Sequence, residues 1–145
     1  MKMLKSVARV AAGVALAGVF AISGAVSAQA LNFQWQVTNS FGSTITLDRA
    51  TCSNGGSISA PFSIASGATV TFFGTSSSTS DLCNARYNGG TGNAFGCQFQ
   101  VQTDGTTGFT STNAYKGSGS SPTCTSLNGN GVSIPGGWSG QFKMQ

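Results

Sequence analysis

The sequence contains no histidine and no glutamate, and its 145 residues include seven Lys or Arg and three Asp. Without histidine the chain lacks the commonest general base and metal ligand, so a Ser-His-Asp or Cys-His site within one chain is excluded. Each aspartate has a structural interpretation: Asp48 adjoins Arg49 at a strand end, Asp81 closes a Ser/Thr loop, and Asp104-Gly105 is a hairpin turn signal. We therefore expect no enzyme activity, no metal site and no cofactor.

The first thirty residues have the pattern of a secretory signal peptide, with three basic residues followed by an apolar run over residues 10–22. The run is too short for a stable membrane span. We expect cleavage after Ala30, with cleavage after Ala28 as the alternative. The mature chain from Leu31 then carries four cations and three carboxylates, too few and too dispersed to bind nucleic acid. The expected location is secreted or extracellular, with the periplasm as an alternative.

Long aliphatic runs are absent after residue 30, so we expect a thin hydrophobic core and a stability that depends more on disulfides. The four cysteines form an even set with no CxxC spacing, which favours two disulfides over a zinc or redox site. Four cysteines allow three pairings. We favour Cys52–Cys83 with Cys97–Cys124, because each link closes a loop of about 30 residues and contributes about 3–4 kcal/mol.

Alternating apolar and polar residues, with an abundance of Ser, Thr, Gly and Asn, predict an all-β chain. Turn signals separate the alternating segments, and the Ser/Gly-rich segments 74–81 and 117–123 are predicted loops. We predict one domain over residues 31–145, an antiparallel β-sandwich of about six to eight short strands. The predicted strands are 31–38, 44–47, 68–72, 95–102 and 138–144, with weaker ones at 57–64 and 108–116.

Aromatic residues at the inward positions of these strands are expected to fill the core: Phe33, Trp35, Phe95, Phe99, Trp138 and Phe142. Phe72 and Phe73 are adjacent, so their rings point to opposite faces of a strand and one of them leaves the core.

Four further aromatic residues lie in or beside polar turns, which makes them candidate contact residues: Phe41, Tyr87, Phe109 and Tyr115. Amphipathic rings on a nearly uncharged surface suit stacking on sugars or resting at a lipid headgroup layer. The alternative is that these rings cover a small second cluster beneath the loops.

Residues 37–72 resemble the aegerolysins and related small β-sandwich cytolysins. The resemblance rests on the strand Val37-Thr38-Asn39, on Pro61, Ile64 and Gly67 in a P-x-x-I-x-x-G turn, and on the following strand Val70-Thr71-Phe72. It implies a non-enzymatic sandwich that recognises membrane lipids through aromatic loop residues, sometimes beside a pore-forming partner. The signal peptide, the cysteines and the scarcity of charge depart from that pattern.

We therefore predict a secreted, non-enzymatic binding protein that contacts a cell surface, either membrane lipid or glycan, through loop aromatics and has a cytolysin-like character. The alternative is an extracellular structural protein of a surface or biofilm. Low charge and the weakly protected strand 95–102 would favour its self-association.

Overall fold

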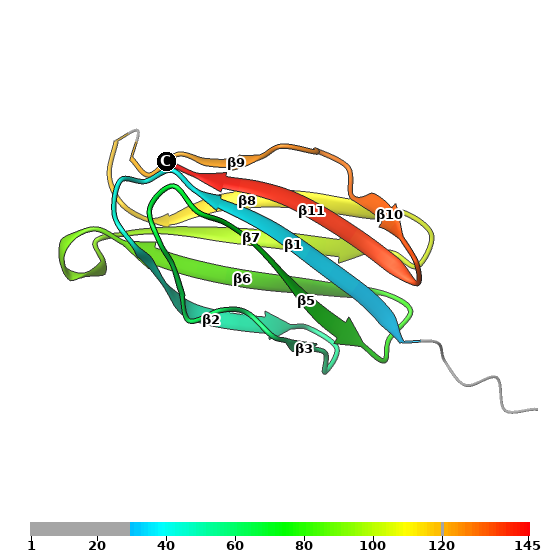
Figure 1. Cartoon of the computed structure of the whole chain (residues 1–145). Coiled ribbons are helices and arrows are strands. Elements are labelled where there is room, and N and C mark those ends of the chain that lie inside the picture. Colours follow the sequence, from blue (N-terminus) through cyan, green and yellow to red (C-terminus); the bar gives the residue numbers. More distant parts are fainter. Residues whose placement is uncertain (1–29, 120) are drawn as a thin grey trace, which may run out of the picture.

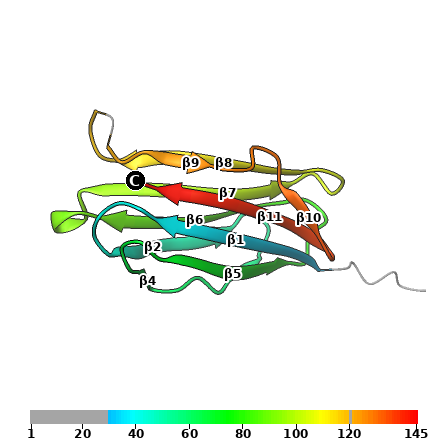
Figure 2. The same ribbon diagram turned by 45° about the horizontal axis from the view of Figure 1, so that its top comes forward.

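Two β-sheets stack face to face in the computed structural model, which describes residues 30–119 and 121–145 (Figures 1 and 2). This is the predicted all-β sandwich. The predicted signal peptide and the Ala28 cleavage site lie outside the described residues, apart from Ala30 itself. No helix in the described part is long and apolar enough to cross a membrane.

Six strands form the sheet that we name sheet A, and five form sheet B. Sheet A has the order β10 (Val132–Ile134), β11 (Gly137–Met144), β1 (Leu31–Asn39), β5 (Thr69–Ser76) and β3 (Ser57–Ile58), with β9 (Cys124–Ser126) also paired to β11. Sheet B has the order β4 (Ser63–Ile64), β2 (Ile45–Cys52), β6 (Asp81–Gly89), β7 (Phe95–Thr103) and β8 (Gly108–Lys116), and a short 3-10 turn, Thr91–Asn93, joins β6 to β7.

One strand pair departs from the predicted antiparallel arrangement: β1 and β11 run parallel, with Phe33 opposite Trp138. The turn before β11 causes this, because it returns the chain to the start of β1. There the Asn32 backbone N–H donates to the Gly136 carbonyl at 2.8 Å. A side chain at Gly137 would clash with the Asn32 carbonyl, so the close approach requires glycine.

The predicted strand over 57–64 is wrong, because the chain crosses between sheets there. β3 pairs with β5 in sheet A and β4 pairs with β2 in sheet B. Pro61, between them, has no N–H to donate to a ladder, so a continuous strand is disfavoured at that point.

β6, the strand between β2 and β7 in sheet B, was not predicted. Its buried side chains include Asp81, Cys83, Ala85 and Tyr87, of which only the last is bulky and aromatic. Buried and less buried residues therefore alternate along β6, but most of the buried side chains are small or polar, so the hydrophobic pattern is weak. The predicted loop 74–81 is correspondingly too long, since its first three residues complete β5 and Asp81 begins β6.

The core between the sheets is a chain of aromatic rings. Trp35 stacks on Phe72 with ring centroids 5.5 Å apart, and Phe72 contacts Tyr87 in the opposite sheet at 6.3 Å. Tyr87 contacts Phe99, which contacts Phe142 back in sheet A at 5.3 Å. The Trp35 indole N–H donates to the Phe99 carbonyl at 3.2 Å, a hydrogen bond between the sheets. These rings fill the space that few aliphatic side chains are available to fill.

Both disulfides have the predicted pairing, Cys52–Cys83 and Cys97–Cys124. The first joins the neighbouring strands β2 and β6 within sheet B. The second joins β7 of sheet B to β9 of sheet A. Together they reinforce the sandwich both within a sheet and between the sheets.

Adjacent phenylalanines provide a matched test of this core. Phe72 is buried, whereas Phe73 is 56% exposed, as the alternation predicts. Phe72→Ala should lower the free energy of unfolding by about 3–5 kcal/mol, because it removes a ring that contacts both sheets. Phe73→Ala should change it by less than about 0.5 kcal/mol. Urea denaturation of the oxidised proteins measures both, and similar losses in the two variants would contradict this account of the core.

Candidate functional site

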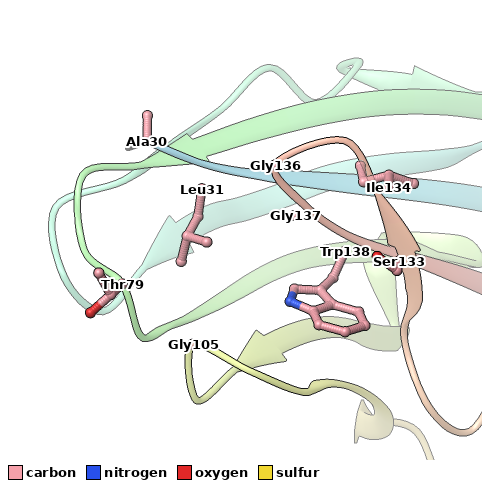
Figure 3. Close-up of a pocket in the computed structure, with 9 residues that line it drawn as sticks. All are labelled: Ala30, Leu31, Thr79, Gly105, Ser133, Ile134, Gly136, Gly137 and Trp138. Atoms are coloured by element: carbon pink, nitrogen blue, oxygen red, sulfur yellow. The ribbon is translucent and has the colours of Figure 1, made fainter. Parts of the chain in front are cut away.

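A pocket of about 370 Å³ opens at the end of the sandwich where β1 begins (Figure 3). Four separate segments meet there: the start of β1, the β5–β6 loop, the β7–β8 hairpin and the β10–β11 turn. The apolar wall comes from Leu31, Ile134 and Trp138, and the remaining lining is small or weakly polar: Ala30, Thr79, Gly105, Ser133, Gly136 and Gly137. We name this hollow the end pocket.

Trp138 is the largest side chain of the end pocket, and Gly108 leaves room for its ring. A side chain at Gly108 would overlap the indole ring, which lies directly over that glycine in β8. Trp138 is partly buried, and Figure 3 shows its indole beside the space between Leu31 and Gly105. Its ring nitrogen has no hydrogen-bond partner among the described residues. The pocket therefore offers an apolar wall with one free N–H donor.

No charged side chain lines the end pocket. Beside it, the Asp104 carboxylate accepts hydrogen bonds from the backbone N–H groups of Thr106 and Thr107 at 2.9 and 2.8 Å. These bonds hold the pKa of Asp104 below its ordinary value, so the carboxylate is ionised at neutral pH. The geometry confirms the predicted Asp104-Gly105 turn.

A second hollow, of about 410 Å³, lies on the outer face of sheet A between Phe73 and the turn at Ile134 and Pro135. Its floor includes the polar side chains of Asn32 and Gln34. Ile134 lines both hollows, so the exposed ring of Phe73 belongs to the same region as the end pocket. Uncharged residues dominate this region.

Of the four predicted contact residues, Phe109 lies near the end pocket. It follows Gly108, the residue beneath Trp138, and is 41% exposed. Phe41 lies at the opposite end, where it is half-buried and contacts Phe95 with ring centroids 5.4 Å apart. That contact matches the alternative of a small second cluster beneath the loops.

Tyr87 was wrongly expected at the surface. Its ring is fully buried between the sheets, and its hydroxyl donates to the Pro61 carbonyl at 2.9 Å. Burial raises the pKa of the phenol well above its ordinary value. Polar neighbours along β6 suggested exposure, but they point to the other face of the strand, so Tyr87 takes no part in a contact surface.

Tyr115 lies half-buried on the outer face of sheet B, away from the end pocket. Its hydroxyl donates to the Asn88 side-chain oxygen and lies 3.4 Å from Asp48 Oδ2. Desolvation, and secondarily the negative charge of Asp48, raise the phenol's pKa above its ordinary value. The structure thus distributes the four predicted residues over four places and does not bring them together.

The residues of the end pocket were not predicted as a site. Trp138 was assigned to the core, and its half-buried state reflects its position at the edge of that core. Its place near the start of β11, after the Pro135-Gly136 turn, is the available sequence signal for an end position. The lining segments are far apart in sequence, so alternation alone does not bring them together.

Asp81 and two cysteines form a compact group, because Cys52 Sγ, Cys83 Sγ and an Asp81 oxygen lie within 4.8 Å of one another. The two sulfurs are bonded to each other, so neither is available as a thiolate ligand. Asp81 accepts the Asn54 backbone N–H at 3.0 Å and so ties the turn after β2 to the start of β6, which is a structural role.

Comparison with solved structures gives an informative likeness. No protein-family model matches this chain, and no curated protein matches it. The fold resembles a solved lipid-binding protein. That structure, of the lipid binding protein Nakanori, aligns with a TM-score of 0.64 over 79% of this chain and 71% of the other, at 11% identity. The likeness shows a shared fold, and the aegerolysin resemblance of residues 37–72 stays a prediction.

The raised pKa values of the two phenols predict a stability loss in alkali. The pKa values of Tyr87 and Tyr115 are raised above the ordinary value of 10.0, so the unfolded chain loses these protons at lower pH than the native protein. The contribution of these two phenols to the free energy of unfolding is therefore fully present below pH 10 and is lost as the pH rises above it.

Tyrosinate absorbance directly tests the direction of these pKa shifts. Near pH 10 the unfolded protein in urea should show about half-ionised tyrosine, and the native protein almost none. Tyr87→Phe should reduce the alkaline loss of stability. Native tyrosines that titrate together with the unfolded ones would contradict the burial of both phenols.

Proposed function

We propose that this chain is a secreted, non-enzymatic protein that binds membrane lipid through the end pocket and the adjoining outer face of sheet A. The observation that carries the proposal is the end pocket itself, with Trp138, Leu31 and Ile134 as its apolar walls. An indole at the edge of a domain, partly exposed and with a free N–H, suits the boundary between water and lipid.

The surroundings of the end pocket support insertion of an apolar group. Phe109 and Val132 are exposed large hydrophobic residues on segments beside it, and Phe73 is exposed on the adjoining face. These side chains gain by leaving water at about 25 cal/mol per Å² of buried apolar surface. The loops between them consist mostly of Ser, Thr, Asn and Gly, whose desolvation costs less than that of charged side chains.

The charge distribution suggests which lipids are bound. No cationic side chain lines the end pocket, and the ionised carboxylate of Asp104 adjoins Gly105, one of its lining residues. Cleavage after Ala30 would place the positive α-amino group of Leu31 at the same pocket. One negative and one positive group at this position leave it without a net charge, so uncharged or zwitterionic lipids are favoured. Because apolar burial supplies the affinity, binding should depend little on salt concentration.

The fold likeness supports the same function, since the sandwich is shared with a protein described as lipid binding. The two disulfides are typical of proteins exported to an oxidising environment, which agrees with the proposed secretion.

Blocking the end pocket tests the proposal. Ser133 is exposed and lines the pocket, so Ser133→Phe should place a ring in it without disturbing the core. We expect about tenfold or greater weakening of binding to vesicles of mixed natural lipids, measured by flotation. Ser111→Phe, at an exposed position on the outer face of sheet B, is the matched control and should bind as the unmodified protein does.

Tryptophan quenching gives a second measurement on the same vesicles. Trp35 is fully buried, so phosphatidylcholine with brominated acyl chains should quench Trp138 and spare Trp35. The proposal fails if the unmodified protein does not float with vesicles, or if both phenylalanine variants float equally well.

A further inference from the structure

The cations of the described chain gather on one surface. Of the four Lys and Arg residues after Leu31, three lie on strands of sheet B: Arg49 in β2, Arg86 in β6 and Lys116 in β8. The fourth, Lys143, lies in β11 of sheet A. We name the group of Arg49, Arg86, Tyr115 and Lys116 the cation cluster.

Two arginines face each other directly in the cation cluster. Arg49 of β2 is paired in register with Arg86 of β6, so both side chains project from the same face of adjacent strands. Like charges at directly opposed positions are destabilising unless something neutralises them. Within residues 30–119 and 121–145 no carboxylate lies within the 4.0 Å of an ion pair from either arginine. Neither arginine therefore has an ion-pair partner in this part of the chain.

The Arg86 guanidinium is held in place by its neighbours. Its Nε donates to Gln98 Oε1 at 2.8 Å, and its central carbon lies 5.1 Å from the centre of the Tyr115 ring. The ring lies close over Gly96, where a side chain would clash with it. This fixed, stacked geometry leaves the two terminal nitrogens of Arg86 without a hydrogen-bond partner among the described residues.

Asp48 is the one carboxylate beside the cation cluster among the described residues, with its Oδ2 3.4 Å from the Tyr115 hydroxyl, and it forms no ion pair with either arginine. Lys116 adds a third positive charge, with its Nζ 6.0 Å from the centre of the same ring. We propose that the cation cluster binds a phosphate group, with the terminal nitrogens of Arg86 and the guanidinium of Arg49 donating to its oxygens. Planar guanidinium groups match the spacing of phosphate oxygens and bind them in pairs.

Phosphate reaches this site from one of two sources, a soluble phosphorylated molecule or a lipid headgroup. Both present the same oxygens to the arginines, and the surface is open to either. The cluster is separate from the end pocket, since no residue is shared between them. The two proposals can therefore fail independently.

NMR titration of the full mature protein with inorganic phosphate tests the site. The Nε–H signals of Arg49 and Arg86 should shift saturably with phosphate and should not shift with chloride at the same ionic strength. Arg86→Gln and Arg49→Gln should each weaken phosphate binding by about tenfold, because each removes charged donors. Lys143→Gln, which removes the same charge from sheet A, is the matched control and should leave the affinity unchanged.

Vesicles of phosphatidylcholine with and without phosphatidic acid distinguish the two sources. A lipid source predicts that phosphatidic acid strengthens flotation and that Arg86→Gln abolishes this gain. A soluble source predicts saturable phosphate binding with no such gain. Equal weakening by Lys143→Gln and Arg86→Gln, or no saturable shift at either arginine, overturns the proposal. Ser133→Phe should retain phosphate binding, so loss of the end pocket and loss of the cluster give different results.

Discussion

The contact between aromatic rings of opposite sheets is the interaction on which the sandwich depends. Phe72 and Tyr87 meet across the two sheets, and Phe99 and Phe142 meet across them again. Each ring buries an area that two or three smaller side chains would otherwise have to supply. Because of this, the strands can carry Ser, Thr, Gln and Asn on their outer faces, and those faces remain available for binding.

The same interaction explains which parts of the fold the sequence predicted. Strands with a bulky residue at every second position, such as β1 and β7, were located almost to the residue. β6 was not predicted because its buried positions include the small residues Cys83 and Ala85, which give a weak hydrophobic pattern. These residues are buried through the disulfide and through contact with the neighbouring rings. The parallel pairing of β1 with β11 depends on the Pro135-Gly136 turn and on long-range contact, which no local pattern encodes.

The candidate sites were harder to predict for a geometric reason. A residue's face on a strand follows from alternation, but its distance from the end of the sheet depends on register. Trp138 and Phe142 share the inward face of β11, yet Phe142 is fully buried and Trp138 is half-buried at the end of the sheet. Tyr87 shows the converse: its neighbours in sequence are polar, yet its ring is buried and its hydroxyl donates to the Pro61 carbonyl inside the molecule.

The positions of the two proposed sites restrict the source of the phosphate. Arg86 is five residues along β6 from Asp81, which begins the strand at the end-pocket side. At about 3.3 Å per residue this places Arg86 about 16 Å from that end. The headgroup layer on each side of a bilayer is only about 5–8 Å thick. If the end pocket meets the membrane with the strands upright, the cation cluster stands in water above the headgroups. In that orientation a soluble phosphorylated molecule reaches the arginines, and a lipid phosphate reaches them only if the sandwich lies on sheet B.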